Sequence, residues 1–251
     1  MEAKKSPSGF VYGIHPVVEA LEAGKPIEKI LLRKEGNLHE RLKEILRVAR
    51  ERGIPVQGVP DERLERIAKG GNHQGVAAQL ASVPFTELEP LLLQLQARGD
   101  VPLLVMLDGV TDVRNLGAIA RAAECMGAHG LILPVSGSAA VNAEAMRASA
   151  GALNHLPVCK EHHLVDSLYM MESYGIQSMA CTEHASDSLF EADLREPLCL
   201  IFGSEELGIN KQLLRRTTRL VRIPLLGQIS SLNVSVAAGI VLAETLRQRY
   251  T

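Results

Sequence analysis

Short apolar runs and amphipathic stretches alternate over the first eighty residues of the chain. This alternation is typical of a small α/β module with its own sheet. The predicted strands are Ile27 to Leu32, Ile54 to Val59 and Gly75 to Leu80. The predicted helices are Gly13 to Glu22, Asn37 to Arg52 with Leu38, Leu42, Ile45, Leu46 and Ala49 inward, and Asp61 to Ala68 with Asp61 as its cap.

From Val101 the pattern changes to continuous apolar runs, which predict buried parallel strands. The strands are 101–107, 130–133, 156–158, 176–181, 198–202 and 220–223, and the helices are 116–126, 139–150, 163–174, 211–216 and 232–249. Together they indicate an open, doubly wound α/β sheet. The predicted domains are therefore residues 1–81 and 101–251, joined by a linker at 82–100 that holds a short Leu-rich helix, Leu88 to Leu95.

Three stretches of the second domain run an apolar strand into a turn that carries glycine together with Asn, Arg or Glu. They are Leu107 to Arg121, Leu200 to Ile209 and Ile223 to Ser235. Because the turns after parallel strands gather at the carboxyl edge of a sheet, we expect a ligand site there. In the third stretch, Ser230 or Ser231 is predicted to cap the last helix.

These turns lack the common fingerprints of nucleotide binding. No G-x-G-x-x-G follows the first strand of the domain, and Gly203 to Gly208 is followed by Ile209-Asn210 where a Walker loop needs Lys-Ser or Lys-Thr. The sequence therefore favours neither NAD nor ATP. It also shows no metal-ligand constellation, because His162-His163 is better interpreted as a solvated helix start than as a ligand pair.

Composition and charge narrow the class of protein. The chain of 251 residues is 46% apolar and 22% charged, as in globular proteins, and no apolar run approaches the length of a membrane span. The net charge is −2, but residues 1–85 hold 14 Lys and Arg against 11 Asp and Glu, whereas residues 100–251 hold 12 against 16. This basic excess in the first third is too modest to indicate RNA by itself.

The N-terminal residues and the cysteines indicate where in the cell the protein is expected. Met1 to Gly9 has basic residues without an apolar core behind them, so we expect a short disordered lead-in rather than an export signal. The cysteines lie far apart in apolar stretches and are expected to be reduced, buried thiols; they are Cys125, Cys159, Cys181 and Cys199. The expected location is the cytoplasm.

Three motifs carry a resemblance to a known family: N-L-G-A-I-A-R at 115–121, F-G-S-E-E-L-G at 202–208 and S-S-L-N-V-S-V-A at 230–237. From Val101 to Tyr250 the chain resembles the SpoU, or TrmH-like, branch of the SPOUT RNA methyltransferases. Over its whole length it is similar to members that methylate a guanosine ribose in the peptidyl-transferase loop of large-subunit, or 23S, rRNA.

The resemblance has implications for the fold and the partners. It implies a parallel sheet with a deep trefoil knot, in which the C-terminal helix is threaded under the loop between Gly203 and Gly208. It implies an L30e-like RNA-binding domain at the N-terminus. It further implies a homodimer whose two chains build the site together, and S-adenosyl-L-methionine as the cofactor.

The resemblance also assigns site residues. The implied cofactor positions are Thr182, Gly203, Ile223 and Leu232, with Leu225 as a further apolar flank for the adenine. The implied catalytic positions are Asn115, Arg121, Glu205, Ser231 and Asn233.

Methyl transfer to a ribose 2′-hydroxyl needs a group that polarises that poor nucleophile. Because a guanidinium rarely gives up its proton, we expect Arg121 to clamp a phosphate and stabilise the developing alkoxide. Asn115 is expected to position Arg121 or the ribose, and Glu205 is expected to orient Arg121 or the loop. Local chemistry alone also allows plainer roles. Asn115 and Ser231 could be helix caps, Arg121 could pair with Glu124, and the Glu205 carboxylate could simply be solvated.

Two places in the N-terminal module are candidates for RNA contact. His15 lies at the start of the first helix, and the Gly-rich loop Gly70 to Gly75 offers hydrogen bonds from Asn72, His73 and Gln74. A helix start and a plain turn before a strand are the alternative interpretation.

Three functions remain open from the sequence. The first is a 2′-O-ribose methyltransferase that acts on 23S rRNA or a large-subunit precursor. The second is the same enzyme acting on tRNA, which the N-terminal module disfavours because the shorter tRNA enzymes of the family lack it. The third is a non-catalytic RNA-binding or ribosome-assembly factor.

Overall fold

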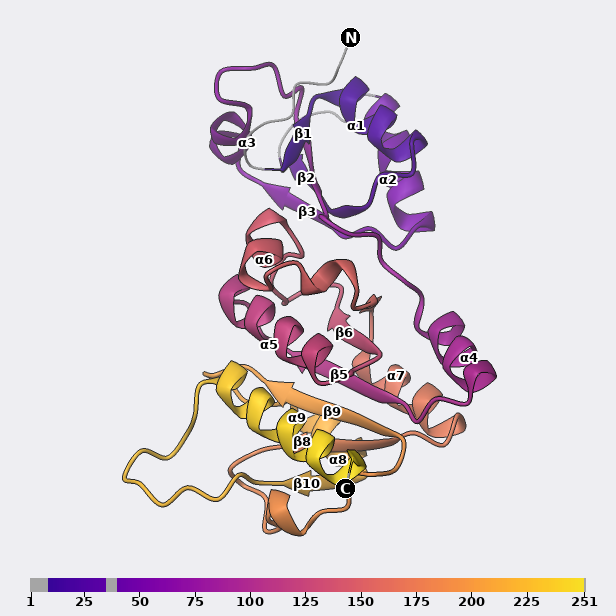
Figure 1. Ribbon diagram of the computed structural model, residues 1–251. Helices are drawn as coiled ribbons and strands as arrows, with labels where there is room; N and C mark the ends of the chain where they lie inside the picture. Colours follow the sequence, from indigo (N-terminus) through magenta and orange to yellow (C-terminus); the bar gives the residue numbers. More distant parts are fainter. Residues whose placement is uncertain (1–8, 35–39, 251) are drawn as a thin grey trace. The chain divides into compact units, whose positions relative to one another are not determined.

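The computed structural model describes residues 9–34 and 40–250, and it divides into two compact units (Figure 1). One unit is Met1–Pro84 with Ala140–Ala143, and the other is Phe85–Ala139 with Glu144–Thr251. Most of the predicted lead-in, and the start of the predicted helix with Leu38, lie outside the described residues.

The N-terminal unit is a four-stranded sheet in the order β1-β4-β2-β3. Its elements are β1 (Phe10–Tyr12), α1 (Ile14–Glu22), β2 (Ile27–Arg33), α2 (Glu40–Glu51), β3 (Val56–Val59), α3 (Asp61–Ala68) and β4 (Val76–Leu80). β2 and β3 are parallel, whereas β4 is antiparallel to β1 and β2. One core cluster joins the sheet to α1 and α2 around Ile30 and Ile45, and a smaller one joins it to α3 around Leu31 and Leu64.

Two local predictions in this unit were wrong. Strand β1 was missed, because three residues are too few to show a period of two; Val11 pairs with Ala78 of β4. Asp61 does not cap α3, because Pro60 occupies the cap position and Asp61 is the first helical residue. The Asp61 carboxylate instead pairs with the Arg33 guanidinium, with Oδ1 2.8 Å from Nε.

The second unit is a six-stranded parallel sheet in the order β10-β8-β9-β5-β6-β7. Its strands are β5 (Leu103–Asp108), β6 (Gly130–Pro134), β7 (Val158–Glu161), β8 (Gln177–Cys181), β9 (Leu198–Gly203) and β10 (Arg219–Val221). Its helices are α4 (Leu88–Arg98), α5 (Val113–Cys125), α6 (Ala143–Ala148), α7 (Leu164–Ser173), α8 (Lys211–Arg216) and α9 (Val234–Tyr250), with short 3-10 turns η1 (Ala152–Asn154) and η2 (Leu189–Glu191). The predicted α/β class with a parallel sheet is confirmed.

Helices lie on both sides of this sheet (Figure 1). Helices α4, α7 and α8 share one buried core cluster with the sheet, and α4 contributes Leu88, Leu91, Leu92 and Leu95 to it. The helix predicted inside the linker is therefore part of the second unit. Helices α5 and α9 contact each other in front of the sheet. This pairing brings the start of α5 toward the start of α9.

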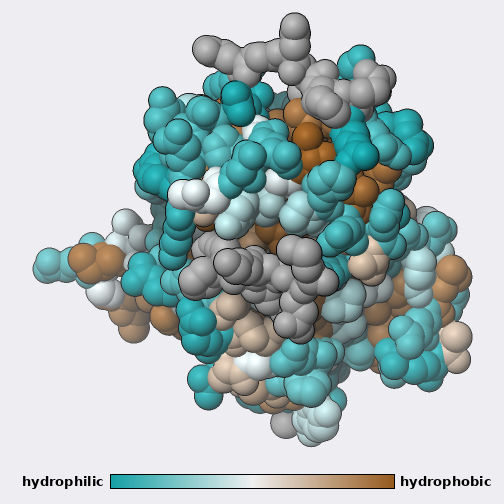
Figure 2. All heavy atoms as spheres, turned by 90° about the horizontal axis from the view of Figure 1, so that it is seen from above, coloured by the Kyte–Doolittle hydropathy of each residue, from teal (hydrophilic) through white to brown (hydrophobic). Residues whose placement is uncertain are grey.

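The chain between β10 and α9 differs from its prediction. Helix α9 begins at Val234, so Leu232 precedes it, and the cap is Asn233 rather than Ser230 or Ser231. Asn233 Oδ1 accepts the backbone N–H of Ser235 at 2.9 Å and of Val236 at 3.3 Å. The segment 222–233 forms a protruding loop in Figure 1, and the same projection carries hydrophobic side chains in Figure 2.

The cysteines are less uniform than predicted. Cys159 and Cys199 are buried, Cys181 is half-buried, and Cys125 is exposed on α5, which the expectation of four buried thiols did not foresee. Among the helices that the structure describes, none has both the length and the apolar character to cross a membrane.

Candidate functional site

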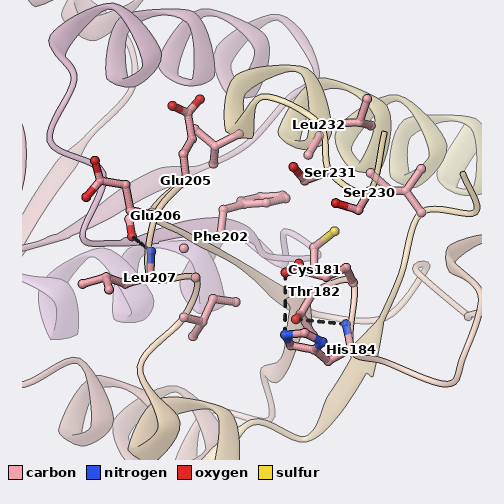
Figure 3. A pocket seen from close by; sticks show the side chains of 18 of the residues that line it. Cys181, Thr182, His184, Phe202, Glu205, Glu206, Leu207, Ser230, Ser231 and Leu232 are labelled. Atoms are coloured by element: carbon pink, nitrogen blue, oxygen red, sulfur yellow. Dashed lines mark hydrogen bonds and ion pairs between the residues drawn. The ribbon is translucent and has the colours of Figure 1, made fainter. Parts of the chain in front are cut away.

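A cavity of about 580 Å³ opens at the carboxyl edge of the parallel sheet. It is lined by the segments that follow β8, β9 and β10 and by the first turn of α9 (Figure 3). All five predicted cofactor residues line it: Thr182, Gly203, Ile223, Leu225 and Leu232. The structure therefore brings together residues that lie up to fifty positions apart in the sequence.

The wall after β9 is a tight turn that requires glycine at Gly203. Ser204 and Gly208 exchange two backbone hydrogen bonds, of 3.1 and 3.0 Å, which fold the turn back on itself. A Cβ atom on Gly203 would lie 2.2 Å from the carbonyl carbon of Gly208. No side chain fits in that space, so the turn presents its backbone to the cavity.

This turn and the segment before α9 line the same cavity, as the predicted knot requires. The passage of the C-terminal segment under the turn stays a prediction.

Three predicted catalytic residues form one hydrogen-bonded group beside the cavity. Asn115 lies in the first turn of α5, which Asp112 caps by accepting the N–H of Arg114. The Asn115 side-chain amide donates to Glu205 Oε1 at 3.2 Å. The Asn233 amide donates to Asn115 Oδ1 at 3.0 Å and also to Glu205 Oε1. We call Asn115, Glu205 and Asn233 the amide–carboxylate group.

Arg121 does not join this group. It is exposed on α5, six residues after Asn115, and it does not line the cavity. Six residues turn a helix by about 240°, so the two side chains leave α5 in different directions. Within one chain the Glu205 carboxylate accepts from the amides of Asn115 and Asn233, and the expectation that it orients Arg121 stays a prediction.

The remaining cavity residues include several that the sequence did not single out. Ser231 lines the cavity as predicted, next to Leu232 (Figure 3). Phe202, Cys181 and His184 also line it, and Figure 3 shows Phe202 between Glu206 on one side and Ser231 and Cys181 on the other. Burial raises the pKa of the Cys181 thiol to about 11, with a smaller effect from Glu183, so this group is a neutral part of the lining at pH 7.

Thr182 is fixed at the floor of the cavity by two interactions. Its N–H donates to the carbonyl of Val221 at 2.9 Å, and its hydroxyl accepts the N–H of His184 at 3.4 Å. The ends of β8 and β10 are thereby held together beside the cavity.

The candidate RNA residues of the N-terminal unit fall into two kinds. Gln74 Oε1 accepts the N–H of Ile14 at 3.0 Å, so its side chain holds the start of α1. The His73 ring is buried, and its Nδ1 accepts the N–H of Gly75 at 3.1 Å. Asn72 and His15 are exposed, although Asn72 Oδ1 also accepts the N–H of Gln74 at 3.1 Å. Three of the four side chains, those of Asn72, His73 and Gln74, therefore accept backbone N–H groups and support the local fold.

Comparison with known families agrees with this architecture. Residues 102–243 match the SpoU rRNA Methylase family, and residues 10–86 match a family described as RNA 2′-O ribose methyltransferase substrate binding. An uncharacterized tRNA/rRNA methyltransferase of Mycolicibacterium vanbaalenii is 36% identical over 98% of this chain and 78% of its own length. A putative TrmH family tRNA/rRNA methyltransferase of Bacillus subtilis is 31% identical over 96% of both chains.

Solved structures show the same fold. The SpoU methyltransferase AviRb of Streptomyces viridochromogenes, determined in complex with AdoMet, matches with a TM-score of 0.61 and 27% identity over 100% of this chain and 94% of its own. An AdoMet-bound rRNA methyltransferase of Sinorhizobium meliloti matches with a TM-score of 0.58 and 27% identity over 95% and 86%. The TrmH/SpoU tRNA modifying enzyme of A. aeolicus matches with a TM-score of 0.55 and 28% identity over 65% and 84%.

These comparisons identify the parallel sheet, with its glycine turn and edge cavity, as that of an α/β RNA methyltransferase. The chain belongs to the SpoU, or TrmH-like, family, whose methyl donor is S-adenosylmethionine.

The cavity suits that cofactor in size and chemistry. Its volume falls within the range of about 300 to 1,000 Å³ that small-molecule sites occupy. Phe202 and Ile223 would supply apolar surface for a flat adenine, and the carboxylates of Glu183, Glu205 and Glu206 would complement a positively charged sulfonium. Among the described residues, no group of three or more His, Cys, Asp and Glu side chains could hold a metal ion.

Proposed function

We propose that this protein methylates the 2′-hydroxyl of a guanosine ribose in 23S rRNA, in the peptidyl-transferase loop, acting in the cytoplasm as a homodimer. The observation that carries the proposal is the amide–carboxylate group, which sets two amides and a carboxylate at the rim of a cavity that suits S-adenosylmethionine. A passive RNA-binding factor would have no need for this arrangement.

The cofactor, when bound, supplies a methyl group on a positively charged sulfur. The Glu205 carboxylate accepts from both amides and so fixes their orientation. Asn115 and Asn233 then hold the ribose so that its 2′-hydroxyl faces the cavity. Arg121 clamps the phosphate of the target nucleotide and stabilises the 2′-oxygen as its proton passes to solvent water. Because a guanidinium keeps its own proton, we assign Arg121 an electrostatic role rather than that of a base.

Two features of the second unit support the homodimer. Arg121 lies outside the cavity lining of its own chain, which supports a site that takes Arg121 from a second copy. The loop before α9 also exposes hydrophobic side chains: Leu226 is fully exposed and Ile229 is 77% exposed. Exposed apolar side chains gathered on one loop are typical of a surface that another chain covers.

The choice of 23S rRNA over tRNA is supported by the N-terminal unit. The rRNA methyltransferase of Sinorhizobium meliloti covers 95% of this chain, whereas the A. aeolicus tRNA modifying enzyme covers 65%. The segment 10–86, which matches the substrate-binding family, offers a second unit for contacts with a large RNA substrate.

Methyl transfer to competing RNAs tests the choice of substrate. The protein is incubated with S-adenosylmethionine labelled in the methyl group and with equal amounts of unmodified 23S rRNA fragments and unmodified tRNA. We expect label in the rRNA. Label in tRNA alone would move the substrate to tRNA, and no label in either, with the cofactor bound, would favour an assembly factor.

A further inference from the structure

A second cavity, of about 440 Å³, opens at the same edge of the parallel sheet. It lies where β5, β6 and β7 end, between the starts of α7 and α8. Asp108 at the end of β5 lines it, and Asp108 is the register partner of Gly203, which lines the first cavity. Neighbouring strands are about 4.8 Å apart, so the two cavities adjoin.

One segment separates the two cavities. Ile209 and Lys211 line the first cavity, whereas Asn210 and Gln212 line the second. Asp108 fixes this wall, because its Oδ2 accepts the backbone N–H of Asn210 at 2.6 Å. A ligand in the second cavity would therefore lie one thin wall away from the cofactor.

The lining of the second cavity combines apolar walls with hydrogen-bonding groups of several kinds. Its apolar part comes from Pro134, Leu164, Val165 and Leu213. Its polar part holds two carboxylates, two side-chain amides and two imidazoles, from Asp108, Asp166, Asn210, Gln212, His162 and His163. The imidazoles and Asp166 are exposed at the mouth, where a ligand enters.

The side chains that line the second cavity favour a flat ring with N–H donors as the ligand. Two carboxylates repel a phosphate, so the cavity does not suit the RNA backbone. The described side chains around it do not form a group that could hold a metal ion. A flat ring with N–H donors on its edge satisfies the carboxylates, and its faces suit imidazole and aliphatic side chains. Among the bases, guanine places N1–H beside N2–H₂, the arrangement that a carboxylate accepts with both oxygens.

We propose that the second cavity binds a guanine base of the RNA substrate, from a nucleotide next to the one that is methylated. The inference rests on the proposed function, because it uses the cofactor cavity to locate the target. Asp166 accepts from the guanine edge, and His162 and His163 contact the ring face. Binding of this base holds the strand in place while the neighbouring ribose faces the first cavity.

Imidazole resonances test the proposal on the intact protein. Carbon–proton NMR spectra are recorded during titration with guanosine 5′-monophosphate and, separately, adenosine 5′-monophosphate. The signals of His162, His163 and His184 are assigned with single His-to-Gln variants. We expect guanosine monophosphate to move the signals of His162 and His163, with an affinity at least fivefold above that of the adenosine nucleotide. No movement of either signal, or equal affinity for both nucleotides, would overturn the proposal.

Two variants sharpen the result. Asp166→Asn removes one charged acceptor and should weaken the binding of guanosine monophosphate about tenfold, equivalent to about 1.4 kcal/mol. Glu191→Gln, an equal loss of charge at an exposed position outside both cavities, should leave the affinity unchanged. If the two variants bind guanosine monophosphate with the same affinity, Asp166 does not recognise the base and the proposal fails.

A separate measurement tests the proposed function independently of guanine binding. S-adenosylmethionine should move the signal of His184, which lines the first cavity. If it does not, the assignment of the cofactor cavity is wrong whatever the guanosine nucleotide does. In steady-state assays Asp166→Asn should raise the KM for RNA about tenfold while the Kd for S-adenosylmethionine stays constant. An unchanged KM would contradict a role in RNA recognition.

Discussion

Glu205 Oε1 lies 3.2 Å from the side-chain amide of Asn115, although 90 residues separate them in the chain. Asn233 donates to the same carboxylate and to Asn115 Oδ1. The turn after β5, the turn after β9 and the start of α9 are thereby held together by one carboxylate. Because Glu205 and Asn233 line the cavity, Asn115 bonds to both, and none of the three is buried, this contact contributes more to the geometry of the site than to stability.

Removal of the carboxylate should reduce catalysis more than stability. Glu205→Gln is expected to lower kcat roughly 10- to 100-fold, because misplaced groups cost about that much. The midpoint of thermal unfolding should change by only about 2 to 4 °C. The double variant with Asn115→Ala should lose little more than the worse single variant, since both changes break the same group. Additive losses in kcat would show that the two residues act independently.

The glycine turn predicts a contrast between two Gly-to-Ala variants. Gly203→Ala forces a Cβ within 2.2 Å of the Gly208 backbone, so the turn must open; we expect a loss of about 1 to 3 kcal/mol of stability and of most cofactor affinity. Gly227→Ala, in the loop before α9, meets no atom within 4 Å and should be nearly neutral. Calorimetric titration with S-adenosylmethionine measures the cofactor affinity of both variants. Equal affinities would mean that the turn does not shape the cofactor site.

Mixed dimers show which chain supplies Arg121. Homodimers of Arg121→Ala and of Asn233→Ala should each be inactive. If one site takes Arg121 from one chain and Asn233 from the other, each mixed dimer keeps one intact site. An equal mixture that exchanges freely should then recover about a quarter of wild-type activity. If the two residues act within one chain, the mixture stays inactive, and light scattering that finds a monomer would also contradict the dimer.

Glu161, at the end of β7, predicts a pH dependence of stability. Burial raises the pKa of its carboxyl, and smaller opposing effects come from Ser167 and His162. The folded state therefore holds the proton more tightly than the unfolded state. The contribution of this group to stability is full below the ordinary glutamate pKa of 4.5 and is lost as pH rises through the folded pKa.

Glu161→Gln removes that titration. Its thermal unfolding midpoint should therefore rise relative to that of the wild type between pH 4.5 and pH 8. Paired thermal scans across this range measure the difference, and a difference that stays constant with pH would show that Glu161 does not titrate in this way.

The sequence predicted the parallel sheet because buried strands appear as local apolar runs, whereas the candidate cofactor residues came from the family resemblance. Apolar runs mark buried strands, and a turn such as Gly203 to Gly208 can be recognised in the sequence by its two glycines. The family resemblance then selected Thr182, Gly203, Ile223, Leu225 and Leu232, all of which line one cavity.

Contacts between distant residues could not be predicted in the same way. Ser230, Ser231 and Asn233 are all good caps, and α9 begins after Asn233 because that residue also bonds to Glu205 and Asn115. Gln74 was a candidate for RNA contact because it lies in a Gly-rich loop, yet tertiary structure places its amide oxygen on the N–H of Ile14, 60 residues away.

The position at which the methyl group is attached tests the central claim most directly. 23S rRNA fragments treated with the protein and S-adenosylmethionine are digested to nucleosides and analysed by mass spectrometry, with Arg121→Ala in parallel. The account predicts 2′-O-methylguanosine from the wild type and at least a 100-fold smaller yield from the variant, on the order expected for the loss of one charge-stabilising group. A methyl group on a base, or on the ribose of another nucleoside, would contradict it.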